Sequence, residues 1–204
     1  EKQVLVKIDQ TLPVTILTTP EQNTEYVLGT MQNASYTCSD ATSSILFCSG
    51  SVASGNAIDT STVGSKIFTV TAQDQAGNMV IVKSNYSVVY AFNGFFSPVD
   101  NLPIQNEVKA GSAVPVKFSL DGNQGLDVSA SGYPITQLIP CSSTAPSDAI
   151  EETDAASNSD LSYDADYDQY VYVWKTTKSW KDTCRQLVMK LNDGSEHKAN
   201  FMFK

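Results

Sequence analysis

The sequence predicts an all-β fold made of two β-sandwich domains in tandem. Short runs in which apolar and polar residues alternate, rich in β-branched and aromatic types, are separated by turn-forming residues, and no long run has the apolar period of a helix. The 204 residues are enough for two ordinary domains. A hairpin pattern at residues 66–90 runs directly into a second series of strands, so we expect the first domain at residues 9–91 and the second at residues 92–204.

The first domain is expected to begin with four short strands, each ended by turn residues. They are predicted at residues 14–17, 25–28, 34–38 and 45–48. The hairpin follows, with alternating runs at residues 66–72 and 79–82 joined by the turn sequence Asp74-Gln75-Ala76-Gly77-Asn78. A turn of this composition between two alternating runs indicates a pair of antiparallel strands.

The second domain is expected to contain five strands. They are predicted at residues 113–120, 135–141, 169–174, 185–191 and 198–203, and the Asp-Gly pair at residues 193–194 is a strong hairpin signal between the last two. The segment Asp164-Ala165-Asp166-Tyr167-Asp168 begins like a helix-loop-helix calcium loop. Gln169 and Lys175 stand where that loop needs glycine and glutamate, so we interpret the segment as a hairpin turn.

One predicted strand carries an aromatic row. Tyr170, Tyr172 and Trp174 alternate along it, and such a row could stack on sugar rings if it were exposed. Because valines occupy the other face, we favour a central strand whose aromatic side chains fill the core. Trp180 lies in a loop-like stretch between lysines and is the better candidate for stacking on a glycan.

The four cysteines favour disulfides over a metal site. A zinc site would need closely spaced cysteines or added histidines, and His197 is the one histidine of the chain. Three connectivities exist on paper, but with a domain boundary near residue 90 the pairing of Cys38 with Cys48 and of Cys141 with Cys184 keeps each bridge inside one domain. Disulfides indicate an oxidising location, outside the cell or on its surface.

The formal net charge of −9 restricts the partners. It opposes binding to nucleic acid or to anionic lipid, no basic patch in the sequence offsets it, and no apolar run is long enough to enter and span a bilayer. An acidic chain suits divalent cations instead. Asp9, Asp74 and Asn78 could converge as oxygen ligands of a calcium ion at the joint before the first domain, although aspartate and asparagine are also common turn formers.

Five segments of the first half form a recognisable series: Tyr36-Thr37-Cys38-Ser39-Asp40, Cys48-Ser49-Gly50, Asp59-Thr60-Ser61-Thr62-Val63-Gly64, Phe68-Thr69-Val70-Thr71-Ala72 and Asp74-Gln75-Ala76-Gly77-Asn78. Over residues 8–90 the chain resembles, on these segments, the bacterial immunoglobulin-like repeats that occur in tandem in secreted and surface proteins. This resemblance implies an immunoglobulin-like fold in a bacterial protein, and a role as spacer or adhesive module. It also implies that residues 1–8 are the last strand of a preceding repeat and that residues 9–13 are a joint.

The second half resembles a small domain named PxKF after its motif. Pro115-Val116-Lys117-Phe118 carries the motif, with residues 95–100 before it and residues 170–175 after it. This domain occurs at the C-terminal end of secreted bacterial proteins. The resemblance implies no activity.

The first eight residues read as a strand with no hairpin partner before it. Val4, Leu5, Val6 and Ile8 supply its apolar positions. The strand could pair with its own sheet, with a preceding domain or with a neighbouring copy, and in the last case copies would assemble head to tail by strand addition.

An enzyme is not expected from this sequence. Asp193, Ser195 and His197 are close in sequence, but neighbours around a hairpin turn do not form a nucleophile, base and orienter that converge in space. We therefore expect a non-catalytic extracellular structural or adhesive module, as a spacer or a fibre subunit, with other copies or adjacent immunoglobulin-like domains as partners and no cofactor other than calcium. The alternative is an accessory polysaccharide-binding module of a secreted hydrolase.

Overall fold

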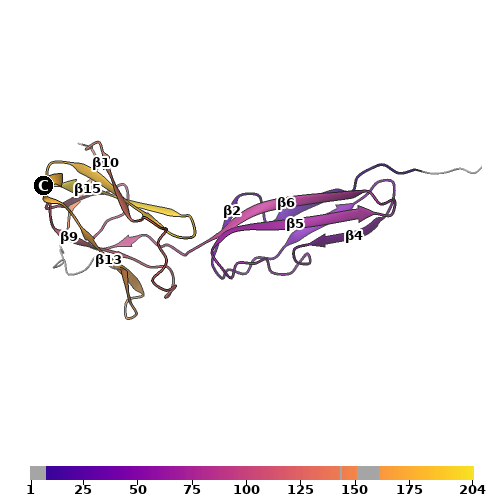
Figure 1. Cartoon of the computed structure of the whole chain (residues 1–204), viewed down its shortest axis with the longest axis horizontal. Coiled ribbons are helices and arrows are strands. Elements are labelled where there is room, and N and C mark those ends of the chain that lie inside the picture. The colour runs from indigo at the N-terminus through magenta and orange to yellow at the C-terminus, as the bar shows by residue number, and fades with distance from the viewer. Residues whose placement is uncertain (1–7, 143, 151–160) are drawn as a thin grey trace, which may run out of the picture. The chain divides into compact units, whose positions relative to one another are not determined.

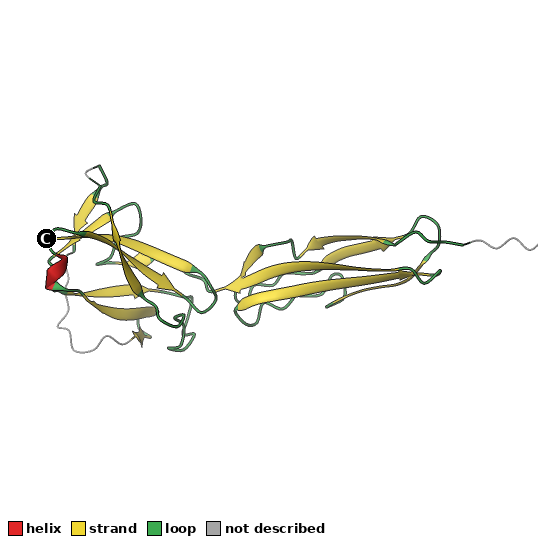
Figure 2. Ribbon diagram, turned by 45° about the horizontal axis from the view of Figure 1, so that its top comes forward, coloured by secondary structure: helices red, strands yellow, loops and turns green. Residues whose placement is uncertain are grey.

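The computed structural model describes residues 8–142, 144–150 and 161–204, and the chain divides into two compact units, Glu1–Val89 and Tyr90–Lys204. Strands build both units (Figures 1 and 2). The helical part of the described residues is one short 3-10 helix, η1 (Lys178–Trp180), drawn in red in Figure 2. The predicted fold class, all-β with two immunoglobulin-like sandwiches, is therefore confirmed.

The first unit is a sandwich of a two-stranded and a four-stranded sheet. Its strands are β1 (Val14–Thr19), β2 (Thr24–Val27), β3 (Ser35–Ser39), β4 (Ile45–Gly50), β5 (Gly64–Asp74) and β6 (Met79–Val89). Strand β1 pairs with β3 in antiparallel fashion, and the larger sheet has the order β2-β6-β5-β4. The predicted hairpin is β5 and β6, which pair in antiparallel register from Gly64 opposite Val88 to Gln73 opposite Met79.

The alternating pattern of the first unit places its core between the two sheets. Phe68, Val70 and Ala72 of β5 are all buried, because every second residue of the strand faces inward. Tyr36 of β3 packs against Phe68 across the sandwich, with ring centroids 6.1 Å apart. The Tyr36 hydroxyl donates to the Val52 carbonyl at 3.1 Å and accepts from the Gly50 amide at 2.8 Å, so this buried polar group is satisfied.

The second unit is a sandwich of a five-stranded and a four-stranded sheet. Its strands are β7 (Phe95–Phe96), β8 (Gln105–Val108), β9 (Ala113–Phe118), β10 (Ile135–Ile139), β11 (Ser147–Ala149), β12 (Leu161–Asp164), β13 (Gln169–Lys175), β14 (Cys184–Lys190) and β15 (Glu196–Phe203). The sheet orders are β10-β14-β15-β8-β11 and β12-β13-β9-β7. Strand β8 pairs in parallel with both β15 and β11, and every other pairing in these two sheets is antiparallel.

The aromatic row of β13 lies in the core, as the sequence indicates. Tyr170 and Trp174 are buried, and β13 is flanked by β12 and β9. The Trp174 ring meets Phe201 of the facing sheet edge to face, with centroids 4.8 Å apart. Tyr172 is half-buried.

The sequence misses four strands of this unit, β7, β8, β11 and β12, and two of them, β8 and β11, share a reason. Strand β8 reads Gln-Asn-Glu-Val and β11 reads Ser-Asp-Ala, so neither has the apolar alternation of an isolated strand. Both are held by parallel pairing to residues distant in the chain, which a local pattern cannot indicate. The Asp164–Asp168 segment is the turn of the β12–β13 hairpin. There the Asp168 carboxylate accepts hydrogen bonds from the Tyr163 and Ser119 hydroxyls at 2.7 and 2.9 Å.

Both predicted disulfides are formed. Cys38 of β3 is bonded to Cys48 of β4 with the Cα atoms 5.9 Å apart, and because β3 and β4 belong to different sheets, the bridge joins the two layers of the first sandwich. Cys141, just after β10, is bonded to Cys184 of β14. No free cysteine remains.

Candidate metal centre

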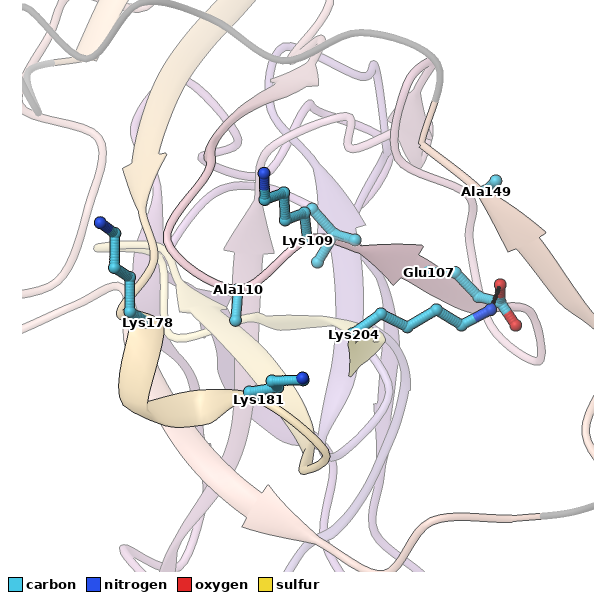
Figure 3. A pocket seen from close by; sticks show the side chains of 8 residues that line it. Glu107, Lys109, Ala110, Ala149, Lys178, Lys181 and Lys204 are labelled. Atoms are coloured by element: carbon cyan, nitrogen blue, oxygen red, sulfur yellow. Dashed lines mark hydrogen bonds and ion pairs between the residues drawn. The ribbon is translucent and has the colours of Figure 1, made fainter.

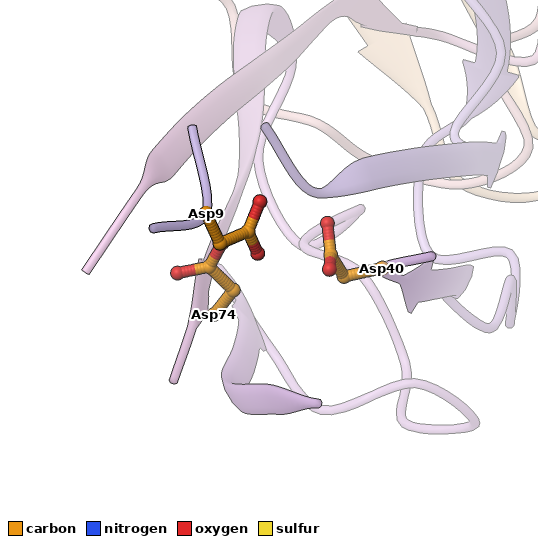
Figure 4. Close-up of side chains that lie close together, drawn as sticks. All are labelled: Asp9, Asp40 and Asp74. Carbon is orange, nitrogen blue, oxygen red and sulfur yellow. The ribbon is translucent and has the colours of Figure 1, made fainter. Parts of the chain in front are cut away.

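Three carboxylates converge at one end of the first unit (Figure 4). Asp9 precedes β1, Asp40 follows β3, and Asp74 is the last residue of β5. One oxygen of each side chain lies within 4.8 Å of the others. The group therefore combines the segment that enters the unit, the loop between β3 and β4, and the β5–β6 hairpin.

Two of the carboxylates use one oxygen each to fix their own loop. Asp9 Oδ1 accepts the Thr11 amide at 2.9 Å, and Asp40 Oδ1 accepts the amides of Thr42 and Ser43 at 2.9 and 2.6 Å. These are the local side-chain-to-backbone bonds by which aspartate stabilises turns. The other oxygen of each group is left for a different partner.

Those second oxygens have no partner. Asp9 Oδ2 and Asp40 Oδ2 are both buried and accept no hydrogen bond within the part of the chain that the structure describes. A buried anionic oxygen without a partner is costly, because it has lost its water and gained nothing in return. Both side chains belong to the converging group, so a cation bound there is a partner that these carboxylates lack.

Asp74 is held between its own hairpin and the entering segment. Its side chain is fully buried, and it accepts the Asn78 amide and the Asn78 side-chain Nδ2, both at 2.8 Å. The same Nδ2 also donates to the Asp9 carbonyl at 3.3 Å. The structure thus brings Asp9 and Asp74 together, as the sequence suggests, and places Asn78 beside them as a donor that positions both.

Asp40 is the member that sequence reasoning misses. Its local signal, an aspartate after a strand with threonine and serine two and three positions later, indicates only a turn. What makes it part of the centre is the antiparallel pairing of β1 with β3, which brings the end of β3 to the start of β1. No pattern within the loop carries that information.

Hydrogen bonds lower the pKa of two of the three carboxyl groups. The hydrogen bond from the Thr11 backbone is the main reason why the pKa of Asp9 lies below its ordinary value. Burial raises the pKa of Asp74, but hydrogen bonds from Asn78, Ser43 and Ala76 outweigh burial and hold that pKa below its ordinary value as well.

Calcium fits this arrangement better than other common ions. Calcium takes oxygen ligands at about 2.3 to 2.6 Å, so two ligands of one ion lie at most roughly 5 Å apart. The three carboxylates meet this limit, because one oxygen of each lies within 4.8 Å of the others. Zinc prefers nitrogen and sulfur, which the centre does not offer. Among the described residues no lysine or arginine forms an ion pair with Asp9, Asp40 or Asp74. A cavity of about 340 Å³, lined by Asp9, Thr42 and Ser43 among others, adjoins the group and can hold water ligands.

The other predicted site residues lie elsewhere. Val4, Leu5 and Val6 of the proposed strand-addition segment are outside the described residues, and Ile8 is exposed. Trp180 packs on Trp174 and Phe203 with ring centroids 5.8 and 5.4 Å away, and the Arg185 guanidinium lies 4.4 Å over its ring. Arg185 therefore covers one face that a sugar would need.

Asp193, Ser195 and His197 contact one another, but their hydrogen bonds stabilise the turn between β14 and β15. The Ser195 hydroxyl donates to Asp193 Oδ1 at 2.7 Å and lies 3.0 Å from His197 Nε2. Asp193 Oδ2 accepts the Tyr90 amide at 2.7 Å. In the hydrolytic arrangement the carboxylate orients the histidine and the histidine takes the proton of the serine. Here the serine proton is bonded to the carboxylate instead.

Within the described part of the chain, we find no helix with the length and apolar character needed to cross a bilayer.

Comparisons with known proteins give no family. No family model matches the chain, and no curated protein matches it. Solved structures with some similarity include fibronectin(III)-like modules of Clostridium thermocellum CbhA, at 12% identity and a TM-score of 0.32 over 94% of both chains.

A Bacteroides ovatus protein, SGBP-B of a mixed-linkage glucan utilization locus in complex with a mixed-linkage heptasaccharide, has 10% identity and a TM-score of 0.29, and the match covers 96% of this chain. The extracellular cadherin domains of protocadherin gamma B7 have 11% identity and a TM-score of 0.28 over 94% of this chain. The chain spans about half the length of these two proteins, at 48% and 50%. At such TM-scores the similarities carry no argument about function, which therefore depends on the geometry of the site.

Proposed function

We propose that the chain is a non-catalytic extracellular structural module in which a calcium ion, held by Asp9, Asp40 and Asp74, ties the entering segment to the first sandwich. The observation that carries the proposal is the convergence of three carboxylates, of which two have a buried oxygen that lacks a partner. The two disulfides support an oxidising location, which is also where free calcium is abundant.

The position of the centre explains what such an ion would do. Asp9 lies before β1, whereas Asp40 and Asp74 belong to loops of the sandwich. Without a cation, three like charges at this distance repel and push the entering segment away from the loops. An ion bound to all three couples the segment to the sandwich, which would limit bending at a joint between tandem domains.

The test is calcium-dependent stability of the first unit. Calorimetry of the full chain follows the unfolding of both units. Both tryptophans of the chain, at positions 174 and 180, lie in the second unit, so tryptophan fluorescence identifies the transition of that unit and the other transition belongs to the first. At calcium ten times above its Kd, linkage adds about 1.4 kcal/mol to the free energy of unfolding, or roughly 6 to 11 °C in Tm for a unit of this size. Magnesium should act more weakly because it demands a smaller octahedral site.

Asp40→Asn is the informative variant, and Glu25→Gln, an exposed site in the same unit, removes the same charge as a control. Asparagine keeps the oxygen that accepts the amides of Thr42 and Ser43, so the loop should remain intact. We expect Asp40→Asn to abolish the calcium effect and, in the presence of chelator, to be at least as stable as the parent chain because one repulsive charge is gone. No binding heat and no change in Tm at millimolar calcium would refute the proposal.

Assembly by strand addition remains a separate prediction, because Val4, Leu5 and Val6 are outside the described residues. Light scattering across concentration, beside a chain that lacks residues 1–8, tests it. Assembly that disappears with the deletion would support a fibre subunit, and a monomer in both cases would leave the module as a spacer.

A further inference from the structure

The second unit gathers lysines around one cavity, which the net charge of the chain conceals. A cavity of about 770 Å³ is lined by Lys109, Lys178, Lys181 and Lys204, with Glu107 as the acidic lining residue (Figure 3). Four of the 13 basic residues of the chain are thus in one place. The expectation that no basic patch offsets the acidic charge is correct for the linear sequence and wrong for this surface.

The lysines come from three segments that the backbone locks together. Lys109 follows β8, Lys204 follows β15, and Lys178 and Lys181 lie in and just after η1. The Lys204 amide donates to the Val108 carbonyl and the Ala110 amide to the Lys204 carbonyl, both at 2.9 Å. The backbone of the site is therefore fixed, and only the lysine side chains must be ordered by a ligand.

A close contact fixes the third segment. Gly111 has a φ of +89°, and a Cβ at this position would lie 2.6 Å from Lys178 Cγ. The Gly111 amide also donates to Thr176 Oγ1 at 3.0 Å, in the segment between β13 and η1. Glycine is needed here for both reasons, its backbone conformation and the approach of Lys178.

The site carries a net positive charge. Lys204 pairs with Glu107, and the hydrogen bond from Lys204 is the main reason why the pKa of Glu107 lies below its ordinary value. Lys109, Lys178 and Lys181 are exposed and form no ion pair with any carboxylate of the described residues. Among the described residues that line the cavity, four lysine side chains less one glutamate leave a charge of +3.

The lining residues distinguish among anionic ligands. None is an arginine, so the site lacks the planar fork that grips a single phosphate through two bonds. None is aromatic, so it lacks a platform on which nucleic-acid bases stack. The lysines stand apart around the opening (Figure 3). The apolar lining residues are Val108, Ala110 and Ala149, here called the apolar floor. Separated lysine charges suit a ligand that carries several separated carboxylates on a rigid frame. The volume of the cavity is typical of sites that bind ligands of a few rings.

We propose that this cavity binds an acidic oligosaccharide, with its carboxylates paired to Lys109, Lys178, Lys181 and Lys204 and its ring faces on the apolar floor. This inference goes beyond the calcium-bound structural role, since it concerns different residues in the other unit.

The experiment is calorimetric titration of the full chain with a galacturonic acid trimer at low salt and with a calcium chelator present. The chelator excludes bridging of the sugar carboxylates through calcium at the aspartate centre. We expect binding to the acidic trimer, none to the neutral galactose trimer, and an affinity at least ten-fold weaker in 0.5 M salt because the exposed charges are screened. The proposal would be overturned if the neutral trimer bound as tightly as the acidic one, or if no binding occurred at millimolar sugar. It would also be overturned by tighter binding of inorganic phosphate, a glutamate peptide or a single-stranded oligonucleotide.

Matched variants locate the ligand. Lys109→Gln with Lys178→Gln should weaken binding at least five-fold, whereas Lys83→Gln with Lys175→Gln, which removes the same charge at exposed sites elsewhere, should leave it within two-fold. Glu107→Gln releases Lys204 and should tighten binding two-fold or more, a gain that a damaged fold would not produce. Equal losses in both double variants, or a loss with Glu107→Gln, would contradict the assignment.

Discussion

The two disulfides are expected to differ in their contribution to stability, because they close loops of different length. The Cys38–Cys48 bridge spans a sequence separation of 10, and the Cys141–Cys184 bridge spans 43. In the chain-entropy account, loops of these lengths correspond to about 2.7 and about 4 kcal/mol at 25 °C. Replacing both cysteines of a pair by serine should lower the free energy of unfolding of the unit that contains them by these amounts.

The assay uses urea unfolding with two optical signals. Tryptophan fluorescence reports the second unit, because the chain has no tryptophan outside it, and far-UV circular dichroism reports both units. With an m-value between about 1 and 2 kcal/mol/M, a loss of about 4 kcal/mol moves the midpoint of the second unit by roughly 2 to 4 M. Serine is the suitable replacement because the buried Gln105 donates to Cys184 Sγ at 3.0 Å, and a hydroxyl keeps an acceptor there.

Loop length also predicts which of the two disulfides contributes more to the free energy of unfolding. The Cys38/Cys48 variant should leave the tryptophan transition in place, and the parent chain in reducing agent should reproduce both variants together. If loss of the shorter loop costs as much as loss of the longer one, the stabilisation comes from local contacts of the sulfur atoms and the entropic reasoning fails. If either double variant moves both transitions equally, the two units do not unfold independently.

Three further changes test individual contacts. Lys66 lies 2.8 Å from Asp59, and its hydrogen bond is the main reason why the pKa of that carboxyl is lowered to about 2. The pair therefore contributes to the stability of the first unit above about pH 4, and this contribution is lost as the pH falls toward 2. Lys66→Gln should raise the Asp59 midpoint in a carbon NMR titration, and an unmoved midpoint contradicts the contact. Burial lowers the pKa of His197, so the second unit should lose stability as the pH falls below about 6.5, and His197→Gln should flatten that dependence in tryptophan-monitored unfolding. Gly50→Ala places a Cβ 2.6 Å from the buried Tyr36 ring and should cost the first unit about 1 to 3 kcal/mol, whereas an unchanged melting curve would mean that the ring moves freely.

Much of the fold was predictable because its strands carry their own signal. The β5–β6 and β14–β15 hairpins have alternating runs on both sides of a turn sequence, so local chemistry determines both the strands and their pairing. Strands β8 and β11 have no such signal. Their neighbours in the sheet are distant in sequence, and tertiary pairing determines their state.

The candidate sites were less predictable for the same reason. Asp9 and Asp74 were found together because a joint and a hairpin turn are recognisable elements, but Asp40 enters the centre only through the register of β1 with β3. The lysine cavity likewise needs the parallel pairing of β8 with β15, which brings residues 109 and 204 to the same edge. Sites built from loops depend on the topology of the whole fold, which a short stretch of sequence does not specify.

The net charge of the whole chain differs from the local charge at each candidate site. A net charge of −9 predicts weak non-specific attraction to long polyanions, since such partners meet the field of a large surface. A small ligand meets a different field, because charges separated by more than about 8 to 10 Å are screened from one another in salt solution. Around the cavity that field is set by four lysines and one glutamate, and around the aspartate centre by three carboxylates. The same acidic chain can therefore hold a cation at one site and a carboxylate ligand at another, and in neither case does the total charge decide the outcome.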